Sequence, residues 1–509
     1  MNISKWIDES AEKFGDKPAI YSNYTSINYS QLKLETDKFA SACKAAGIKK
    51  GDRVGICMIN CIEAVISIFG AIKAGGIIVC IHPKLPLNKL REIIIDANIN
   101  LLVSTQFYEF IPEISLGIYH HIQKDNNKNI SFPWVAFGDW ISSGVTNEPH
   151  QEGDIAALIY TSGSTGKAKG IISTHNNILF STDAINQYLR NCQNDKVLSY
   201  LPLSFDYGLY QLFLTVSRGA TLFLEEPPNF LKEITKYLKE KEISGFPGLR
   251  NLFTLLTSNA DEQYPLIRYV TNTGDALHND VIAKLKKMFP NAELFLMYGL
   301  TECKRVSYLP PSLVSKKINS VGVPLQGTSV IIKNDSGNEC APYEIGELYV
   351  TGPNVCQGYW NRPNETSSTF LFEQSVNTLR TGDLFYKDDE GFLYYVSRKD
   401  NSFKSNGFRI DPAGLEVAIK EKFPILMDVI VVGIPDNVAG QLVGLYLVTN
   451  ISYSLEDSVV QYCNDEFEPW QRPKFILQKN HVPLTPSGKI NRNEIVKLFI
   501  NQFIKKESP

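Results

Sequence analysis

Residues 160–170 read YTSGSTGKAKG and continue the apolar run IAALIYT at residues 155–161. The apolar run predicts a buried strand, and the glycines after it let the backbone turn tightly and approach a ligand closely. Exposed backbone N–H groups in such a loop form a concave site for anions, and hydroxyl and ammonium side chains add donors. The segment therefore predicts a loop that holds the phosphates of a nucleotide. The residues assigned to this phosphate loop are Thr161, Ser162, Gly163, Ser164, Thr165, Gly166, Lys167 and Lys169.

The phosphate loop differs from the P-loop of kinases and P-loop NTPases. That pattern requires a hydroxyl residue directly after its lysine, whereas Ala168 follows Lys167, and it requires glycine where this chain has Thr161. The spacing needed for the Mg²⁺ site of those enzymes is therefore missing. The other alternative, a surface loop without a ligand, does not account for the density of glycines, hydroxyls and lysines.

Outward from the phosphate loop, strand-like and helix-like segments alternate, which predicts layered α/β architecture. Residues 52–59 indicate a buried strand, residues 63–74 a helix, and residues 77–81 another strand after the stop at Gly75-Gly76. Lys73 and the glycines interrupt this apolar stretch, so a buried helix–turn–strand is favoured over a membrane span. Further short strands are expected at 197–201, 221–224 and 294–297.

The pattern changes after about residue 320, where short strands joined by turns predict a small β subdomain at 330–333, 346–351 and 391–396. The α/β alternation then resumes at 414–422, 429–433 and 455–466. We therefore expect a large N-terminal domain of layered α/β subdomains plus a β subdomain over residues 1–398. A small mobile α+β domain is expected over residues 399–509, with the boundary in a charged stretch.

Composition excludes several classes of protein. The 509 residues are 43% hydrophobic and 21% charged with a net charge of −3, so no basic surface for nucleic acid is expected. The nine cysteines include no CxxC pair, which fits a reducing compartment. The N-terminus lacks the apolar core of a signal peptide. We expect a cytoplasmic protein without a membrane partner.

Three more motifs lie downstream: YGLTE at 298–302, RTGD at 380–383 and PSGKINR at 486–492. With these motifs the sequence resembles the adenylate-forming superfamily of acyl-CoA synthetases, luciferases and adenylation domains of non-ribosomal peptide synthetases. The phosphate loop of that family reads TSG[ST]TGxPKG, and this chain has Ala168 at the usual proline. The change makes the loop more mobile without deleting a phosphate donor. The resemblance runs from Gly51 to Lys489 and implies ATP and Mg²⁺ as cofactors.

The resemblance also assigns roles to residues around the nucleotide. Tyr298 packs on the adenine, Thr301 contacts the α-phosphate region and Glu302 binds Mg²⁺, because a carboxylate beside a triphosphate is otherwise repelled. Asp383 accepts hydrogen bonds from both ribose hydroxyls, which suits a group with two acceptor oxygens. Arg398 also reaches the ribose, although Ser397 replaces the glycine that usually precedes it.

The C-terminal motifs imply a reaction in two steps. Lys489 resembles the catalytic lysine that contacts the carboxylate and the α-phosphate during adenylation, where a fixed positive charge stabilises the transition state. Asp400 matches the hinge residue, and Gly407 and Arg409 match the loop that enters the site for thioester formation. Rotation about such a hinge lets one cleft host two sets of catalytic groups.

The acid-binding pocket is read from LSFDYGLYQL at 203–212, which aligns with the substrate motif of the family. In amino-acid-activating members, an aspartate at the position of Asp206 pairs with the substrate amine. Burying the ionised carboxylate without such a partner would cost free energy. Alternatively, Arg305 neutralises Asp206 internally. Two tyrosines narrow the pocket, which predicts a small acid. The remaining residues assigned to the wall are Tyr207, Tyr210, Gly245, Thr271, Thr273, Met297 and Val306.

These features predict an AMP-forming acid–thiol ligase. The pattern is similar to stand-alone ligases that load proline onto a carrier protein, so a small amino acid is the expected substrate. The acceptor is expected in trans, either a carrier protein or coenzyme A. One alternative is an acyl-CoA synthetase for a fatty or aryl acid. Another is a nucleotide-binding regulatory protein without catalysis, which Glu302, Asp383 and Lys489 together disfavour.

Overall fold

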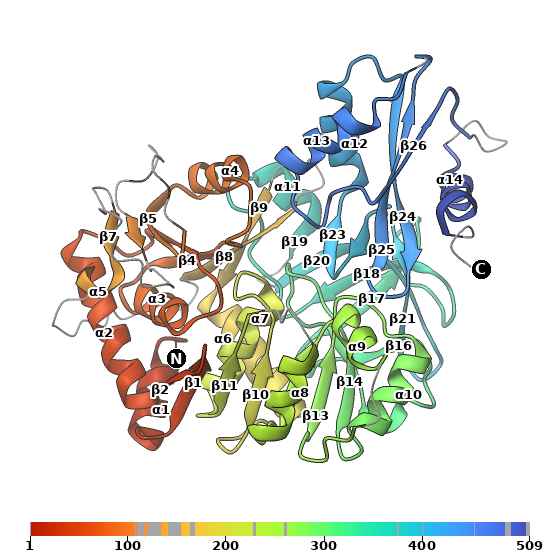
Figure 1. Cartoon of the computed structure of the whole chain (residues 1–509). Helices are drawn as coiled ribbons and strands as arrows, with labels where there is room; N and C mark the ends of the chain where they lie inside the picture. Colours follow the sequence, from red (N-terminus) through yellow and green to blue (C-terminus); the bar gives the residue numbers. More distant parts are fainter. Residues whose placement is uncertain are drawn as a thin grey trace.

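The structure of the chain is a computed structural model with a large N-terminal lobe and a small C-terminal domain beside it (Figure 1). It describes residues 2–106, 108, 114, 117–119, 134–140, 154–162, 168–226, 231–258, 262–373, 376–399, 401–451, 453–483 and 490–504. The expectation of a mixed α/β fold with a large first domain and a small second one is confirmed.

One sheet of the lobe is seven-stranded in the described part of the chain, with the order β7-β6-β5-β3-β4-β8-β9. Its strands are parallel except at the last pair, where β8 and β9 run antiparallel with Ser162 opposite Ala168. The phosphate loop therefore joins the two strands of a hairpin. The strands are β3 (Arg53–Cys57), β4 (Ile77–Cys80), β5 (Ile99–Ser104), β6 (Gly117–Tyr119), β7 (Trp134–Ala136), β8 (Ile155–Ser162) and β9 (Ala168–Thr174).

Helices cover both faces of this sheet because its strand residues are apolar on both sides. Ile78 packs with α2 and α3 on one face, whereas Ile77 and Val79 pack with α4 on the other, as alternation along a strand requires. The helices are α1 (Lys5–Phe14), α2 (Tyr29–Ala45), α3 (Ile62–Lys73), α4 (Leu87–Ala97) and the short α5 (Phe137–Trp140).

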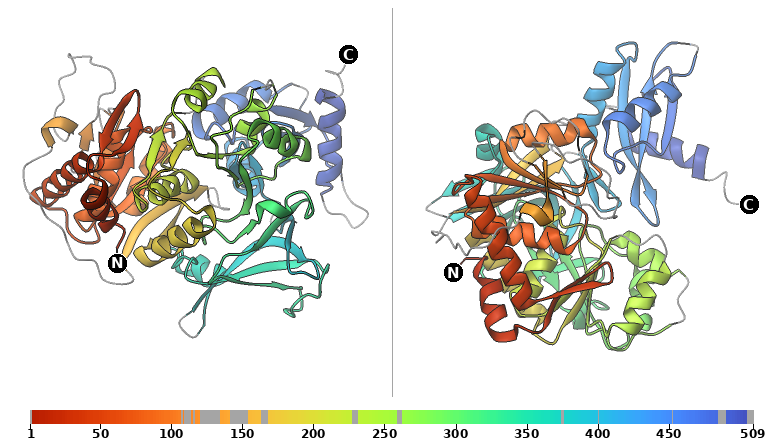
Figure 2. Two further views of the ribbon diagram at one scale, coloured as in Figure 1. Left: turned by 90° about the horizontal axis from the view of Figure 1, so that it is seen from below. Right: turned by 60° about the vertical axis from the view of Figure 1, so that its left-hand side comes forward.

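A second sheet, 14-stranded among the described residues, contains a parallel core of β11, β10, β12, β13 and β14. Antiparallel strands β15 and β16 extend this core directly into the β subdomain, which projects from the helices in the left view of Figure 2. The strands are β1 (Pro18–Ser22), β2 (Thr25–Asn28), β10 (Lys196–Ser199), β11 (Thr221–Leu224), β12 (Gly245–Gly248), β13 (Tyr269–Asn272), β14 (Glu293–Tyr298), β15 (Ser307–Leu309), β16 (Ser320–Pro324), β17 (Ser329–Lys333), β18 (Gly346–Thr351), β19 (Phe370–Glu373), β20 (Val376–Lys387) and β21 (Leu393–Arg398).

The two sheets share one hydrophobic core, which contains residues of α3, α6 and α7 between them. Helices α8, α9 and α10 pack in a separate cluster on the other face of the second sheet. Helix α6 begins at Thr174, whose side chain accepts a hydrogen bond from the backbone of Asn177 in a capping box. The helices are α6 (His175–Leu189), α7 (Asp206–Val216), α8 (Leu231–Glu240), α9 (Arg250–Leu256), α10 (Asn279–Met288) and α11 (Pro363–Thr369).

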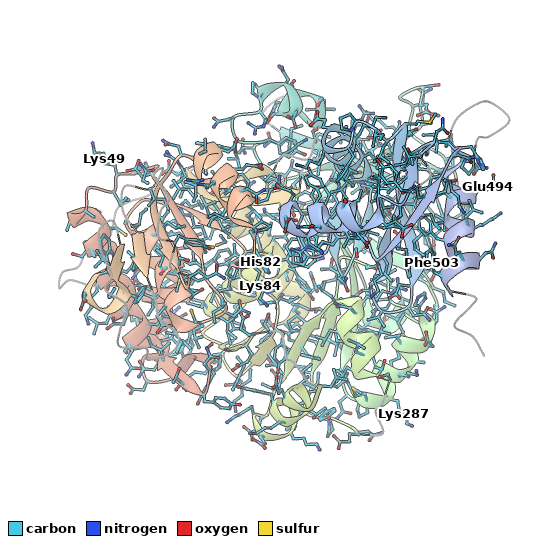
Figure 3. The ribbon with its side chains drawn as sticks, turned by 45° about the horizontal axis from the view of Figure 1, so that its top comes forward. Lys49, His82, Lys84, Lys287, Glu494 and Phe503 are labelled. Carbon is cyan, nitrogen blue, oxygen red and sulfur yellow. The ribbon has the colours of Figure 1, made fainter. Side chains whose placement is uncertain are left out.

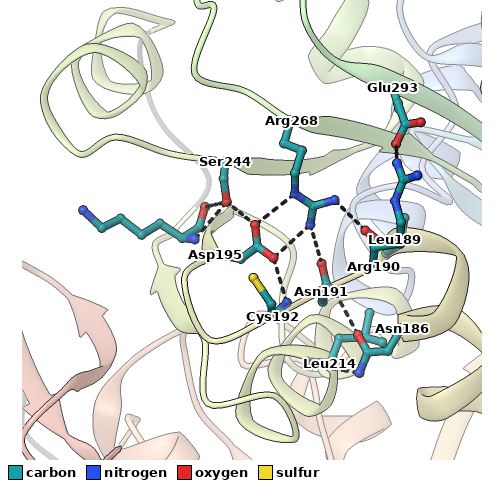
Figure 4. A network of polar contacts seen from close by, with 11 residues as sticks. Asn186, Leu189, Arg190, Asn191, Cys192, Asp195, Leu214, Ser244, Arg268 and Glu293 are labelled. Carbon is teal, nitrogen blue, oxygen red and sulfur yellow. Dashed lines mark hydrogen bonds and ion pairs between the residues drawn. The ribbon is translucent and has the colours of Figure 1, made fainter.

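A buried polar network ties the amino ends of the parallel strands together (Figure 4). Asp195 precedes β10, Ser244 precedes β12 and Arg268 precedes β13, and both of the other side chains bond to the Asp195 carboxylate. Arg268 also donates to the carbonyl of Leu189 at the end of α6 over 2.6 Å. This network holds the amino ends of these strands together. Their carboxyl ends remain available for a ligand, as in other α/β sheets.

The C-terminal domain has its own sheet, in which β23, β22, β25 and β24 are antiparallel and β26 pairs with β25 in parallel. Helices α12 and α13 pack on one face and α14 on the other, so α14 lies at the outer edge of the molecule (Figure 1). The elements are β22 (Phe403–Ser405), β23 (Phe408–Ile410), α12 (Pro412–Lys422), β24 (Asp428–Asp436), β25 (Gly440–Val448), α13 (Glu456–Glu466), β26 (Phe475–Lys479) and α14 (Arg492–Phe499).

The helix–turn–strand expected at 63–81 is confirmed by α3 and β4. Each strand expected along the chain is also present, with ends shifted by a few residues. Within the described residues, no helix combines the length and apolar character needed to cross a bilayer. The sequence did not predict that the β subdomain continues the second parallel sheet through β15 and β16.

Candidate active site

A cavity of about 200 Å³ lies where both lobe sheets and the C-terminal domain meet. Its described lining comes from three regions: the carboxyl ends of lobe strands, helices α6 and α7, and the start and middle of the C-terminal domain. The lining includes Thr161, Ile185, Tyr188, Asp206, Tyr207, Tyr210, Gln211, Thr271, Thr273, Met297, Thr301, Glu302, Arg305, Lys404, Gly407, Phe408, Arg409, Glu468 and Trp470.

Helix α7 presents one face to the cavity. Asp206, Tyr207, Tyr210, Gln211 and Leu214 line it at the spacing expected of a single helical face. Burial raises the pKa of Tyr207 to about 12, so the phenol stays protonated and can donate a hydrogen bond. This helix therefore forms the wall to which the sequence assigned the acid-binding pocket.

Strand β13 completes the same wall. The Tyr207 hydroxyl lies 2.6 Å from Thr271 Oγ1 and donates to the Thr271 carbonyl at 3.0 Å, so the ring orientation is fixed from β13. Thr273 and Met297 also line the cavity.

Two residues assigned to the wall lie elsewhere. Val306 is fully buried among β-subdomain residues, and Gly245 starts β12 with its Cα facing the ring of Tyr269. Arg305, the neighbour of Val306 in the chain, does line the cavity.

Asp206 and Arg305 both line the cavity, but the structure contains no ion pair between them. The Asp206 carboxylate accepts from the backbone of Tyr207, and Arg305 donates to Thr273 Oγ1 at 2.6 Å. The internal neutralisation considered as an alternative for Asp206 is therefore absent from this arrangement, since no described cation forms an ion pair with its carboxylate.

On the nucleotide side of the cavity, Thr161 faces Thr301 and Glu302. The Glu302 carboxylate accepts a hydrogen bond from the Tyr359 hydroxyl at 3.1 Å, and Glu302 lines the cavity. No cluster of three or more His, Cys, Asp or Glu side chains suited to a metal occurs in the described residues. One carboxylate nevertheless fits Mg²⁺, which commonly takes few protein ligands and completes its shell with phosphates and water.

A connected trio outside the cavity lining consists of Tyr298, Asp383 and Arg398. The Tyr298 hydroxyl donates to Asp383, and Arg398 Nη1 lies 2.6 Å from the second carboxylate oxygen. Burial raises the pKa of Asp383, an effect that Arg398 opposes, and burial with the nearby carboxylate raises the pKa of Tyr298. The structure thus brings together the residues assigned to the adenosine, although they do not line the cavity itself.

Several assigned residues lie outside the described part of the chain, namely 163–167 of the phosphate loop, the hinge residue Asp400 and the lysine Lys489. For Ser162 the backbone is described. Lys169 forms an ion pair with Glu365 and lies 5.4 Å from the centre of the Tyr359 ring. Helix α14, which follows Lys489 in sequence, packs on the outer face of the C-terminal sheet, and Glu494 lies at the outer edge in Figure 3.

The C-terminal domain instead turns its first hairpin toward the cavity. Lys404, Gly407, Phe408 and Arg409 line it, and the resemblance assigns Gly407 and Arg409 to the loop for thioester formation. Gly407 has φ +85° and lies against Leu249 of the lobe, where a larger residue would clash. Burial lowers the pKa of Lys404, an effect that Asp383 opposes.

Contacts between lobe and C-terminal domain involve residues that the sequence analysis did not identify. His82 meets Trp470 edge-on at 5.4 Å, and Asn88 of α4 donates to Glu466 of α13 at 2.6 Å. Figure 3 places His82 near the middle of the molecule, beside the C-terminal domain. Burial lowers the pKa of His82 to about 4 and raises that of Glu468 to about 7. No local pattern marks these residues, because only domain docking brings them together.

Residues 7–360 match the AMP-binding enzyme family, and residues 419–489 match the C-terminal domain of AMP-binding enzymes. The chain belongs to the AMP-binding enzyme family. This AMP-binding enzyme is 28% identical to a long-chain-fatty-acid–CoA ligase of Bacillus subtilis (strain 168), over 96% of this chain and 93% of the relative. It is also 28% identical to a 2-succinylbenzoate–CoA ligase of Bacillus licheniformis, over 97% of this chain and the full length of the relative.

Among solved structures, two structures of o-succinylbenzoate CoA synthetase (MenE) from Bacillus subtilis are similar to this chain. A double mutant with a CoA-containing product analogue gives a TM-score of 0.83 at 26% identity, over 96% of this chain and 97% of that one. The same enzyme with ATP and magnesium gives 0.69 at 24% identity, over 96% and 98%. The fold is shared in both cases.

A third solved structure, VinN with L-aspartate, is 27% identical with a TM-score of 0.67. The match covers 78% of this chain and 98% of VinN.

Proposed function

We propose that the chain is an AMP-forming ligase that activates a small carboxylic acid with ATP and Mg²⁺ and transfers the acyl group to coenzyme A. Relatives named as CoA ligases over nearly the whole chain support this acceptor. One observation carries the proposal: a single cavity contains Thr161 and Glu302 from the nucleotide motifs, α7 from the acid motif and the hairpin with Gly407 from the thioester motif.

In the first step, a carboxylate oxygen of the acid attacks the α-phosphorus of ATP, the bond between the α- and β-phosphates breaks, and pyrophosphate leaves. Lys489 stabilises the charge that develops, and the phosphate loop holds the departing pyrophosphate. Glu302 would hold Mg²⁺, which when bound would supply positive charge against the triphosphate. No protein nucleophile is needed, because positioning and charge stabilisation lower the barrier.

In the second step, the C-terminal domain turns about Asp400 and the hairpin with Gly407 replaces Lys489 at the cavity. A thiolate sulfur attacks the acyl carbon, and AMP leaves with the electron pair of the broken acyl–phosphate bond. The rings of Phe408 and Trp470 line the cavity from the C-terminal domain, which suits an uncharged thiol arm better than a charged one.

A small acid fits this cavity better than a long fatty chain. Tyr207 and Tyr210 of α7 both line the cavity and fill space that a long acyl chain would need. Polar groups of Tyr188, Tyr207 and Arg305 close the acid end, whereas a fatty chain requires an apolar tunnel.

A second candidate function is the loading of a small amino acid onto a carrier protein. The observation that favours it is Asp206, which lines the cavity at the start of α7 without an ion-pair partner among the described residues. A substrate ammonium placed there would compensate the carboxylate. Proline remains one such substrate.

The test measures ATP–pyrophosphate exchange with L-proline, L-aspartate, benzoate, 2-succinylbenzoate, octanoate and palmitate. We expect exchange with at least one small acid and none with palmitate. Thioester formation is then measured with coenzyme A and with a holo-carrier protein in parallel. Stronger exchange with octanoate or palmitate contradicts the small-acid pocket, and acylation of the carrier alone favours the second candidate. ATP binding without exchange for any acid contradicts both.

A further inference from the structure

Arg305 is a buried cation at the acid end of the cavity. Its side chain is 7% exposed and lines the cavity between α7 and β13. Two features hold its backbone in place. Lys304 has φ +60°, which turns the chain inward after the YGLTE motif, and the buried Asn354 side chain donates to the Arg305 carbonyl at 3.0 Å. The fold therefore fixes the Arg305 backbone beside the cavity, and the hydrogen bond to Thr273 orients its side chain.

The contacts of Arg305 leave its charge uncompensated. Nη1 donates to Thr273 Oγ1 at 2.6 Å, and the guanidinium carbon lies 5.7 Å from the centre of the Tyr207 ring. Nε is buried and has no hydrogen-bond partner in the described structure. No described Asp or Glu forms an ion pair with Arg305, whereas most other buried or half-buried arginines here have one, such as Arg398 with Asp383.

Removing a guanidinium from water without an anion is costly. The neutral contacts of Arg305, which are with the hydroxyls of Thr273 and Tyr188 and with the Tyr207 ring, offset only part of the cost. Burial raises the pKa of Tyr188, and Arg305 opposes the rise, so the charge acts on a neutral phenol beside it. A guanidinium with free donors in a dry pocket matches a planar carboxylate in shape as well as in charge. The missing partner is therefore a group that the substrate brings.

We propose that the acid substrate carries a second carboxylate and that Arg305 binds it. This inference rests on the proposed function and specifies its substrate class as a dicarboxylic acid, including acidic amino acids. One carboxylate faces the α-phosphate of ATP, and the other faces Arg305 at the end of the pocket. Thr273 orients the guanidinium from the opposite side. Asp206 faces the same cavity and accommodates an amino group where the substrate has one.

The first arm of the test is binding without catalysis. Melting temperatures are measured for wild type and Arg305→Met with succinate, glutarate, L-aspartate and L-glutamate, and with their amide counterparts succinamate, glutaramate, L-asparagine and L-glutamine. At least one diacid is expected to raise the melting temperature of the wild type in a saturable manner, while its amide does not. Arg305→Met is expected to lose this response. Without ligand it is expected to melt at or above the wild-type temperature, because an uncompensated buried charge is removed.

The second arm is pyrophosphate exchange with the same pairs. The diacid is expected to exceed its amide at least tenfold in kcat/KM for the wild type, mainly through KM. In Arg305→Met this ratio falls to about one, and Arg305→Lys keeps an intermediate ratio because it retains the charge without the planar fork. Arg218→Met is the matched control, since Arg218 is half-exposed, pairs with Asp183 at the surface and does not line the cavity.

The outcomes separate the two proposals. Equal exchange with diacid and amide, or a ratio unchanged by Arg305→Met, overturns the role of Arg305 and leaves the ligase intact. Saturable binding of a diacid that depends on Arg305, without exchange, supports the role of Arg305 and contradicts the ligase. Absence of any Arg305-dependent binding or exchange across the diacids overturns the inference. A lowered melting temperature of unliganded Arg305→Met, together with an unchanged diacid-to-amide ratio of kcat/KM, also overturns it.

Discussion

The rings of Phe408 and Trp470 stack with their centroids 3.9 Å apart and their planes 11° from parallel. Both belong to the C-terminal domain, and each also reaches the lobe: Phe408 lies 5.9 Å from the Phe205 ring, and Trp470 lies 5.4 Å from the His82 ring. The pair therefore joins the C-terminal domain to the lobe beside the cavity.

Replacement of Trp470 by alanine is expected to slow thioester formation and to spare adenylation. The substitution removes two ring contacts of about 0.5–1.5 kcal/mol each, which together correspond to about 5- to 150-fold in rate. The measurement compares thioester formation from a supplied acyl-adenylate with pyrophosphate exchange. Tyr453→Ala, an exposed aromatic of the same domain, is the control and is expected to change neither. A parallel loss of both activities in Trp470→Ala would contradict a role confined to thioester formation.

Replacement of Lys489 by alanine is expected to have the opposite profile. Loss of one preorganised charge contact lowers adenylation by about 10²–10³-fold, while thiolysis of supplied acyl-adenylate stays nearly intact. Pyrophosphate exchange and single-turnover thiolysis measure the two steps separately. Lys479→Ala removes an exposed lysine from the same domain and is the matched control. An equal loss in both steps would refute the assignment of Lys489 to the first step.

Local sequence patterns predicted most of the fold, because burial on one or both faces of a strand or helix leaves a periodic record. The strand at 155–161 and the helix over 63–74 are examples that β8 and α3 confirm. Docking of domains leaves no such record. His82 and Trp470 are far apart in the sequence, and each looks like an ordinary surface residue until the C-terminal domain packs on the lobe.

The same contrast holds within the site. The positions on α7 were predicted together, since one helical face carries Asp206, Tyr207 and Tyr210. A loose alignment assigned both Arg305 and Val306 to the pocket, and the structure places only Arg305 at the cavity. The lack of an ion pair between Asp206 and Arg305 depends on distances between separate elements, which no spacing along the chain encodes.

The fully buried Lys73 gives a prediction about stability in the lobe. Its ammonium lies 2.7 Å from the Asp8 carboxylate and 2.6 Å from that of Asp37, and so links α1, α2 and α3. Lys73→Met is expected to lower the free energy of unfolding by about 3 kcal/mol, because Asp37 stays buried with one partner fewer. Chemical denaturation of the lobe measures the change.

The control for Lys73 is Lys38→Met on the same helix layer. Lys38 pairs with Glu35 at 2.9 Å, but both side chains are about one-third exposed. An exposed pair of this kind contributes at most about 1 kcal/mol. Equal effects of the two substitutions would show that burial does not determine how much the Lys73 ion pairs contribute to the free energy of unfolding.

Glu468 makes the docked arrangement sensitive to pH. Burial raises the pKa of its carboxyl to about 7, and Lys89 on α4 opposes the rise while Glu92 adds to it. The docked state therefore keeps a proton that the undocked or unfolded state, with a pKa near the usual 4.5, has already lost. The resulting stabilisation is complete below about pH 4.5 and is lost as pH rises to 7, by at most about 1.4 kcal/mol per pH unit.

Glu468→Gln is expected to remove this dependence. His82 has a lowered pKa of about 4 and contributes in the opposite sense, because its neutral form is favoured on docking, so stability from His82 rises between about pH 4 and 6.5. The difference between variant and wild type cancels the contribution of His82. Melting temperatures or a fluorescence measure of domain docking are recorded from pH 5 to 8, and the wild-type value is expected to fall relative to that of Glu468→Gln as pH rises to about 7. Parallel curves for the two proteins would show that protonation of Glu468 is not linked to domain docking.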